Sequence, residues 1–171
     1  RLTAVARLHE QAAAIAAEAY SRINENLGVA MVTTGPGATN AITAVAGAWI
    51  ESVPLMIISG QVKRADMLKN APLRQKGVQE VDIISMVKSV TKYAVTVENP
   101  ADIKQVMQEA YYHAREGRAG PVWIDVPLDV QAMAIDVDSL AEFNPPGSHK
   151  KISLGSDIAA LQQLLQVAER P

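Results

Sequence analysis

Short apolar stretches alternate along the chain with longer segments in which apolar residues recur at helical spacing. The short runs predict five β-strands, at residues 2–6, 27–33, 54–60, 93–97 and 120–127. The longer segments predict α-helices at residues 9–26, 38–52, 82–89 and 100–116. Strands that alternate with helices are typical of an α/β fold, with an open parallel sheet and helices on both faces.

The apolar character of the run at 27–33 is uninterrupted, which predicts a strand buried on both faces. The helix predicted at 38–52 is rich in small residues, so it can pack closely against a neighbour, such as the same helix of a second copy. A polar segment at 63–80 predicts a long loop, and long loops in compact domains are often functional.

Composition narrows the classes of protein that remain open. Hydrophobic residues make up 49% and aromatic residues 4% of the 171 residues, so the core is aliphatic. The net charge of −2 gives no indication of nucleic acid or membrane binding, and no apolar run approaches the ~18 residues of a membrane span. Cysteine is absent, which excludes disulfides and thiolate chemistry and fits a cytoplasmic protein.

The domain organisation is predicted from changes in composition. Residues 1–135 carry the α/β pattern, residues 136–153 are acidic and then rich in Pro and Gly, and residues 154–171 contain one more helical pattern. We expect a domain, a linker and the start of a further domain. The chain begins with Arg1 and ends with Pro171 directly after that pattern, so we expect it to be a piece of a longer protein.

The stretch Thr33-Thr34-Gly35-Pro36-Gly37-Ala38-Thr39-Asn40 joins a predicted strand to a predicted helix. Ligands of open parallel sheets bind at the carboxyl ends of strands. The stretch is neither a dinucleotide fingerprint nor a phosphate-binding loop followed by Lys, and Pro36 has no N–H to offer a phosphate. A flat heterocycle is therefore a more natural ligand than a phosphate, although an ordinary turn is the simpler interpretation.

Glu10 opens the helix that follows the first predicted strand, so it is expected at the same edge of the sheet. A carboxylate in a first helical turn is also favoured by the helix dipole alone. The basic residues between 63 and 76 indicate either a solvated loop or a site for a phosphate-bearing substrate or a flavin. The three His residues are scattered and predict no metal site, while Asp125 and Asp129 are interpreted as turn and cap residues.

Four motifs keep a common order along the chain, and together they are more specific than any one of them. They are His9-Glu10-Gln11, the stretch 33–40, Pro54-Leu55 leading to Ser59-Gly60-Gln61-Val62, and Gly120 to Pro127. This arrangement resembles the pyrimidine-binding domain of thiamin diphosphate enzymes, in the branch of acetolactate synthase large subunits and their decarboxylase and lyase relatives. The resemblance covers residues 1–131 and implies that the first strand of the fold precedes Arg1.

The resemblance implies an enzyme that acts on a 2-keto acid, as a carboligase or decarboxylase. A Glu at the position of Glu10 hydrogen-bonds N1′ of the aminopyrimidine ring in this family, which promotes removal of the proton from thiazolium C2. Gly35, Pro36 and Asn40 would pack on or near the pyrimidine. Gln79 matches a Gln that reaches the thiazolium side in acetolactate synthases.

Further expectations concern cofactors and partners. The family binds Mg²⁺ and the diphosphate through a Gly-Asp-Gly motif in a separate domain, and this chain contains no such motif. The resemblance therefore implies a homodimer or homotetramer in which this domain faces a second subunit, and it leaves FAD open as an additional cofactor.

Two departures from the family pattern bear on the substrate. Val78 stands where acetolactate synthases usually carry Phe, and the segment from Gln61 to Gln79 is longer and more basic than theirs. The pattern is closer to acetolactate synthase-like proteins of uncertain substrate.

Two other classes of function stay open at this point. A non-catalytic dimerisation or ligand-sensing domain of the same fold would have no chemical need for Glu10. A plain nucleotide-binding α/β domain would be expected to carry the glycine fingerprint that is missing here.

Overall fold

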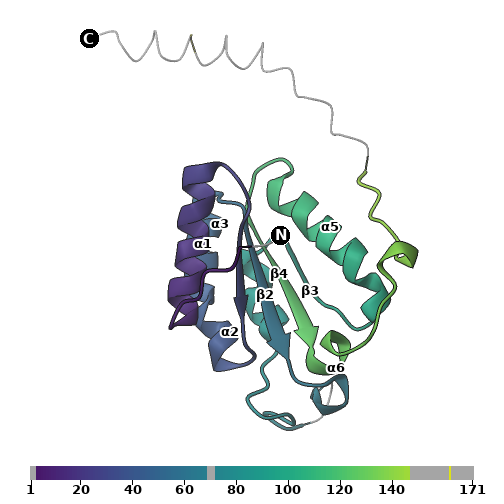
Figure 1. Ribbon diagram of the computed structural model, residues 1–171. Coiled ribbons are helices and arrows are strands. Elements are labelled where there is room, and N and C mark those ends of the chain that lie inside the picture. The colour runs from purple at the N-terminus through teal and green to yellow at the C-terminus, as the bar shows by residue number, and fades with distance from the viewer. Residues whose placement is uncertain (1–2, 69–71, 147–161, 163–171) are drawn as a thin grey trace.

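The computed structural model describes residues 3–68, 72–146 and 162 (Figure 1). At its centre lies a sheet of four strands, which are β1 (Gly28–Val32), β2 (Leu55–Gln61), β3 (Tyr93–Thr96) and β4 (Pro121–Pro127). Every strand pair is parallel and the order is β1-β2-β4-β3. The predicted α/β fold with an open parallel sheet is confirmed.

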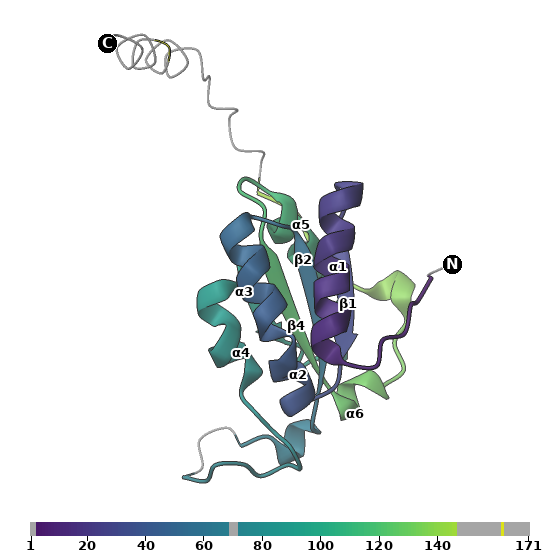
Figure 2. The same ribbon diagram turned by 90° about the vertical axis from the view of Figure 1, so that its left-hand side faces the viewer.

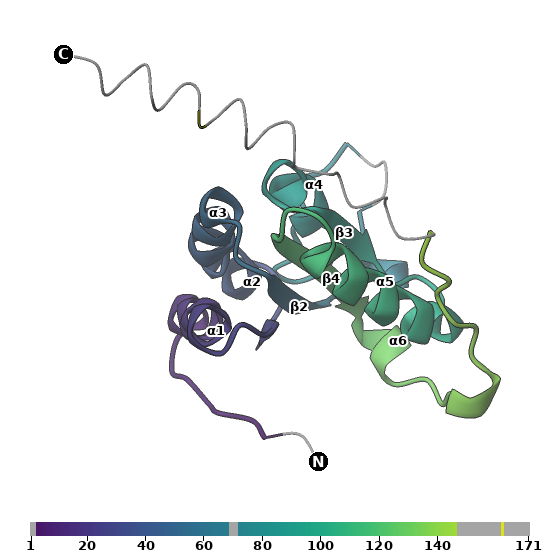
Figure 3. The same cartoon turned by 90° about the horizontal axis from the view of Figure 1, so that it is seen from above.

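Helices cover both faces of the sheet. The longer ones are α1 (Glu10–Asn24), α3 (Ile42–Glu51) and α5 (Ile103–Arg115), and the shorter ones are α2 (Pro36–Asn40), α4 (Ile83–Val87) and α6 (Leu128–Gln131). Figure 3 shows α1 and α3 on one side of the strands and α5 on the other. Single 3₁₀ turns lie at Arg64–Asp66, Lys88–Val90, Pro100–Asp102 and Val137–Ser139.

Two hydrophobic clusters hold the helices on the sheet. On the face of α1 and α3, small side chains meet Leu55, Ile57 and Trp123 of the sheet, and these small residues are Ala14, Ala17, Ala44 and Ala48. Because alanine side chains are short, the helices lie close to the strands. The opposite cluster packs Val106, Ala110 and Ala114 of α5 against Met56, Val122 and Ile124.

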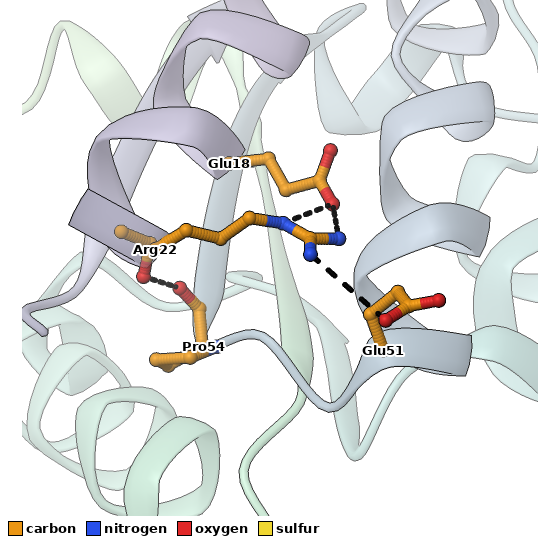
Figure 4. Close-up of polar contacts among 5 residues, drawn as sticks. Glu18, Arg22, Glu51 and Pro54 are labelled. Carbon is orange, nitrogen blue, oxygen red and sulfur yellow. Dashed lines mark hydrogen bonds and ion pairs between the residues drawn. The ribbon is translucent and has the colours of Figure 1, made fainter.

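Polar contacts tie α1 to α3 and to the start of β2 (Figure 4). Arg22 Nη2 lies 2.7 Å from Glu18 Oε1, and Arg22 Nη1 lies 3.9 Å from Glu51 Oε2. These ion pairs are partly exposed, so each contributes little to stability. The buried Ser21 hydroxyl lies within hydrogen-bonding distance of two carbonyl oxygens, those of Asn26 and of Pro54, the latter at 2.6 Å, and so links the end of α1 to the residue before β2.

Two predictions about local structure were wrong in detail. Residues 3–6 are exposed and do not form the strand predicted at 2–6, because they pair with none of the described strands. The predicted helix at 38–52 begins earlier, at Pro36, and is interrupted at Ala41, which separates α2 from α3.

The prediction that β1 is buried on both faces was also wrong. Val29 is 49% exposed and Met31 is 77% exposed. Both side chains lie on the sheet face that carries α5, beside Met56 and Ile58 of β2. Helix α5 packs on β2, β3 and β4, so the edge strand β1 stays uncovered on that side.

The segment predicted as a linker begins with irregular chain and a single 3₁₀ turn. It runs along α5, where the Phe143 N–H donates to Gln108 Oε1 at 2.8 Å and Glu142 pairs with Lys104 at 2.7 Å. The domain boundaries at 135 and 153 stay predictions. The segment 154–171 with its predicted helix lies outside the described residues, apart from residue 162.

Candidate functional site

The carboxyl ends of the parallel strands and the beginning of α1 meet at one edge of the molecule. In Figure 1 the arrowheads point to this edge, where α2, the loop after β2 and α6 lie. Figure 2 shows the start of α1 beside α2. The structure therefore brings together the two segments that the sequence placed at a common edge, Glu10 and the stretch 33–40.

Glu10 is the first residue of α1, and its position is fixed from two sides. His9 caps the helix, with Nδ1 accepting a hydrogen bond from the Gln11 N–H at 3.2 Å. Asn40, at the end of α2, donates from Nδ2 to Glu10 Oε2 at 3.1 Å. The amide of Asn40, the backbone N–H of Glu10 and the charge of His9 lower the pKa of Glu10 below its ordinary value, against a smaller opposing effect of burial.

The turn between β1 and α2 has no room for side chains at its two glycines. A Cβ at Gly37 would lie 2.4 Å from Thr33 Cγ2 and 3.1 Å from Glu10 Oε1. Gly35 has φ of 62°, a conformation that other residues rarely adopt. Between them Pro36 is exposed, so the Glu10 carboxylate approaches a bare backbone with a rigid apolar ring beside it.

Gln79 reaches the same place from a distant part of the chain. A Cβ on Gly35 would lie 2.0 Å from the Gln79 carbonyl oxygen, so the two backbones are in direct contact. Gln79 itself has φ of 60°, and its side chain is exposed. The structure thus gathers Glu10, Gly35, Pro36, Asn40 and Gln79, which are the residues that the sequence singled out.

Beneath the turn lies a buried polar network that sequence reasoning missed. Asp125, interpreted from the sequence as a turn residue, is 1% exposed within β4. Asp125 Oδ1 accepts from the Ser59 hydroxyl at 2.6 Å, and Asp125 Oδ2 accepts from Gln61 Nε2 at 3.0 Å. Burial raises the pKa of Asp125 to about 6, an effect that Asp82 reinforces and the donated hydrogen bonds oppose. Polar residues inside strongly apolar strand runs were the signal that could have revealed this network.

The basic loop is organised by Glu80, another residue that sequence reasoning missed. Its buried carboxylate accepts the backbone N–H groups of Leu68, Lys76 and Gly77, the last two at 2.9 and 3.0 Å. Burial alone would raise the pKa of Glu80, but these backbone donors and the charge of Lys76 lower it below its ordinary value.

Asp129, interpreted from the sequence as a turn or cap residue, lies in the first turn of α6 and also holds the loop. The Arg64 backbone N–H donates to Asp129 Oδ1 at 2.9 Å, and Arg64 Nε donates to Asp129 Oδ2 at 2.7 Å. The loop is therefore fastened to the carboxyl end of β4.

The chemistry of this donor set fits an aminopyrimidine ring better than a phosphate. One carboxylate faces a turn of bare backbone, and Arg64 of the basic loop is already paired with Asp129. Within residues 3–68 and 72–146, no group of three or more His, Asp or Glu side chains is placed to hold a metal ion. No helix in that part of the chain combines the length and apolar character needed to cross a membrane.

The parallel α/β fold, with a carboxylate set against a Gly-Pro-Gly turn, agrees with membership of the thiamin diphosphate enzymes. The family described as thiamine pyrophosphate enzyme, N-terminal TPP binding domain, matches residues 1–86, and the chain belongs to it. Thiamine pyrophosphate (TPP) is another name for thiamin diphosphate.

Relatives of known name are similar over most of the chain. An acetolactate synthase large subunit of Lactococcus lactis is 39% identical over 166 residues, which are 95% of this chain and 28% of that protein. Acetolactate synthase 1, chloroplastic, of Oryza sativa is 38% identical over 93% of this chain and 24% of its own length. The large subunit of Porphyra purpurea is 44% identical over 71% of this chain and 20% of its own. The chain thus spans about a quarter of the length of these relatives.

Proposed function

We propose that this chain supplies the pyrimidine-binding half of a thiamin diphosphate site in an acetolactate synthase-like enzyme that acts on 2-keto acids. The observation that carries the proposal is the Glu10 carboxylate, held by Asn40 at 3.1 Å and set against the bare backbone of Gly37. The names of the relatives, all acetolactate synthases, support the choice of enzyme class.

Each residue of the site takes a separate role. Glu10 holds a proton at N1′ of the aminopyrimidine ring, because a carboxyl group is a good hydrogen-bond partner for a ring nitrogen. Gly35 and Pro36 form the surface against which the ring lies, and Asn40 orients the Glu10 carboxyl group. The exposed side chain of Gln79 extends toward the thiazolium side. When bound, the cofactor supplies the carbanion chemistry that a protein side chain cannot.

The rest of the enzyme is proposed from the same family membership. Mg²⁺ and the diphosphate bind to a part of the site that this chain does not contain, in a second subunit of a homodimer or homotetramer. The substrate is a small 2-keto acid, which loses CO₂ before its remaining fragment is added to an acceptor carbonyl. FAD is an additional cofactor to test, and the absence of cysteine supports a cytoplasmic location.

The test is CO₂ release by the whole protein, measured with pyruvate and other 2-keto acids in the presence and absence of thiamin diphosphate and Mg²⁺. We expect release that requires both cofactors. Replacing Glu10 by Gln keeps the size of the side chain and removes its acidity, so it should lower turnover by about 10²-fold or more.

Glu18→Gln is the matched control, because Glu18 lies on the same helix but pairs with Arg22. This variant should keep near-normal turnover. Turnover of Glu10→Gln within a few-fold of wild type would contradict the proposed role of Glu10. Cofactor binding without release from any 2-keto acid would argue for a non-catalytic domain of this fold.

A further inference from the structure

Gln61 is the last residue of β2, and its side chain lies between the two loops that form the site. Its Oε1 accepts from the Thr34 hydroxyl at 3.1 Å, directly before Gly35. Its Nε2 donates to the Val81 carbonyl at 3.0 Å, two residues after Gln79. One side chain therefore holds a residue next to each partner of the contact between Gly35 and Gln79.

The amide of Gln61 is 5% exposed and its hydrogen-bonding capacity is full. Besides the bonds to Thr34 and Val81, its Oε1 accepts from the Val62 N–H at 2.9 Å and its Nε2 donates to Asp125 at 3.0 Å. An amide has two donor hydrogens and two acceptor positions, so all four are used. The amide cannot turn over without placing its NH₂ group against donors and its oxygen against acceptors.

Asp125 fixes which way the Gln61 amide faces. The Asp125 carboxylate is itself held by the Ser59 hydroxyl, which accepts from Trp123 Nε1 at 2.8 Å. These groups lie on adjacent strands in the centre of the sheet, because Ser59 is the register partner of Asp125 in the pairing of β2 with β4. The orientation of Gln61 is therefore set by the rigid core and not by the loops that it holds.

We propose that Gln61 is a positioning residue for the cofactor site, because it sets the contact between Gly35 and Gln79 through Thr34 and Val81. The inference rests on the proposed function and extends it to a residue that does not touch the ring. The contact is tight enough that a Cβ on Gly35 would overlap the Gln79 carbonyl oxygen at 2.0 Å. A shift of either loop would therefore open the surface on which the pyrimidine lies.

The first test needs no cofactor. Hydrogen–deuterium exchange of the whole protein, without thiamin diphosphate, compares wild type with Gln61→Leu and Thr34→Val. Gln61→Leu should speed exchange in both segments, 33–37 and 77–82, by about fivefold or more, since each loses a hydrogen bond to a buried partner. Thr34→Val should affect mainly 33–37, and Thr34→Ser, which keeps the hydroxyl, should match wild type.

The second test separates positioning from a general loss of stability. At a temperature where every variant is folded by circular dichroism, Thr34→Val should weaken thiamin diphosphate binding and lower kcat by about fivefold, with the KM for the 2-keto acid unchanged. Thr34→Ser should restore both values. Thr34→Val stays informative if Gln61→Leu does not fold, because only one partly exposed hydroxyl is removed.

The outcomes distinguish this inference from the proposed function. Unchanged exchange in both segments, or unchanged binding and kcat in Thr34→Val, would overturn the role of Gln61 while cofactor-dependent turnover of wild type would keep the function intact. Failure of wild type to bind thiamin diphosphate would overturn the function and the positioning role together, whatever the exchange data show.

Discussion

The Asn40 side chain donates a hydrogen bond of 3.1 Å to the Glu10 carboxylate, joining the end of α2 to the beginning of α1. This bond is the largest single cause of the lowered pKa of Glu10. Asn40→Ala removes the donor, so the pKa of Glu10 should rise toward its ordinary value. NMR titration of ¹³C-labelled glutamate carboxyl groups in the cofactor-free protein would follow this change directly.

Asn24→Ala is the control for that titration, because the Asn24 amide donates to the Tyr20 carbonyl near the far end of the same helix. It should leave the Glu10 titration unchanged. An unchanged pKa of Glu10 in Asn40→Ala would mean that the Asn40 bond does not hold the carboxylate in solution.

Replacing Gly37 or Gly47 by Ala places a methyl group beside a glutamate carboxylate, and we expect the two variants to differ in cofactor binding. Gly37→Ala would push a methyl group against Thr33 Cγ2 at 2.4 Å and against Glu10 Oε1 at 3.1 Å. We expect thiamin diphosphate affinity to fall by about tenfold or more, measured by isothermal titration calorimetry on the whole protein with Mg²⁺.

Gly47→Ala provides the comparison on α3. There the added methyl group meets the Glu18 carboxylate, with Oε1 at 3.7 Å and Oε2 at 3.9 Å, which is ordinary van der Waals contact. Alanine also favours a helix over glycine by about 1 kcal/mol, so this variant should be slightly more stable with unchanged cofactor affinity. Equal affinities for the two variants would count against the site at Gly37.

Because the Glu80 carboxylate holds the loop at 63–80, we expect its loss by mutation or by acid to loosen that loop. Glu80→Gln replaces one acceptor oxygen by an NH₂ group, which would face backbone donors of Lys76 and Gly77. We expect faster trypsin cleavage after Arg74 and Lys76, by about fivefold, because the loop loses its anchor. Glu98→Gln, a change at an exposed carboxylate, should leave the cleavage rate as in wild type.

The same loop should loosen in mild acid. The pKa of Glu80 is lower in the folded protein than in an unfolded chain, so its stabilising effect is present above its ordinary pKa. That effect is lost as the pH falls through the lowered value. Hydrogen exchange of residues 63–80 across this range should show the loss in wild type, while Glu80→Gln should already be loose at neutral pH.

The stabilising effect of Asp125 should depend on pH in the opposite direction to that of Glu80. Its pKa is about 6 in the folded protein against an ordinary value of 3.8, so the folded state binds the proton more tightly. Its contribution to stability is full below about pH 4 and is lost as the pH rises toward 6, with an upper limit of about 3 kcal/mol. Since an asparagine side chain cannot ionise, the stability deficit of Asp125→Asn should narrow over this range. Parallel urea denaturations at several pH values would measure it, and a deficit independent of pH would contradict the raised pKa.

Local patterns predicted much of the fold. The apolar runs placed four of the five predicted strands within a residue or two, since burial in a parallel sheet requires continuous apolar stretches. The same reasoning failed at residues 2–6, where no described strand lies alongside, and at β1, where Val29 and Met31 face outward at the edge of the sheet. Periodicity reports what a segment can bury and does not report whether a neighbour is there to cover it.

The sequence by itself determined that the turn at Gly35 lies at the carboxyl edge of the sheet, because this turn follows a strand that forms as predicted. Glu10 lies at the same edge as the first residue of α1, although residues 3–6 before it do not form the predicted strand. The sequence also supplied Gly35, whose positive φ few other residues can adopt. Only the tertiary structure decided that Gln79 lies on Gly35, that Glu80 anchors the basic loop and that Gln61 joins both segments through Thr34 and Val81. Most of those contacts join residues far apart in the chain, and their geometry is set by how whole strands and loops pack, which no local pattern encodes.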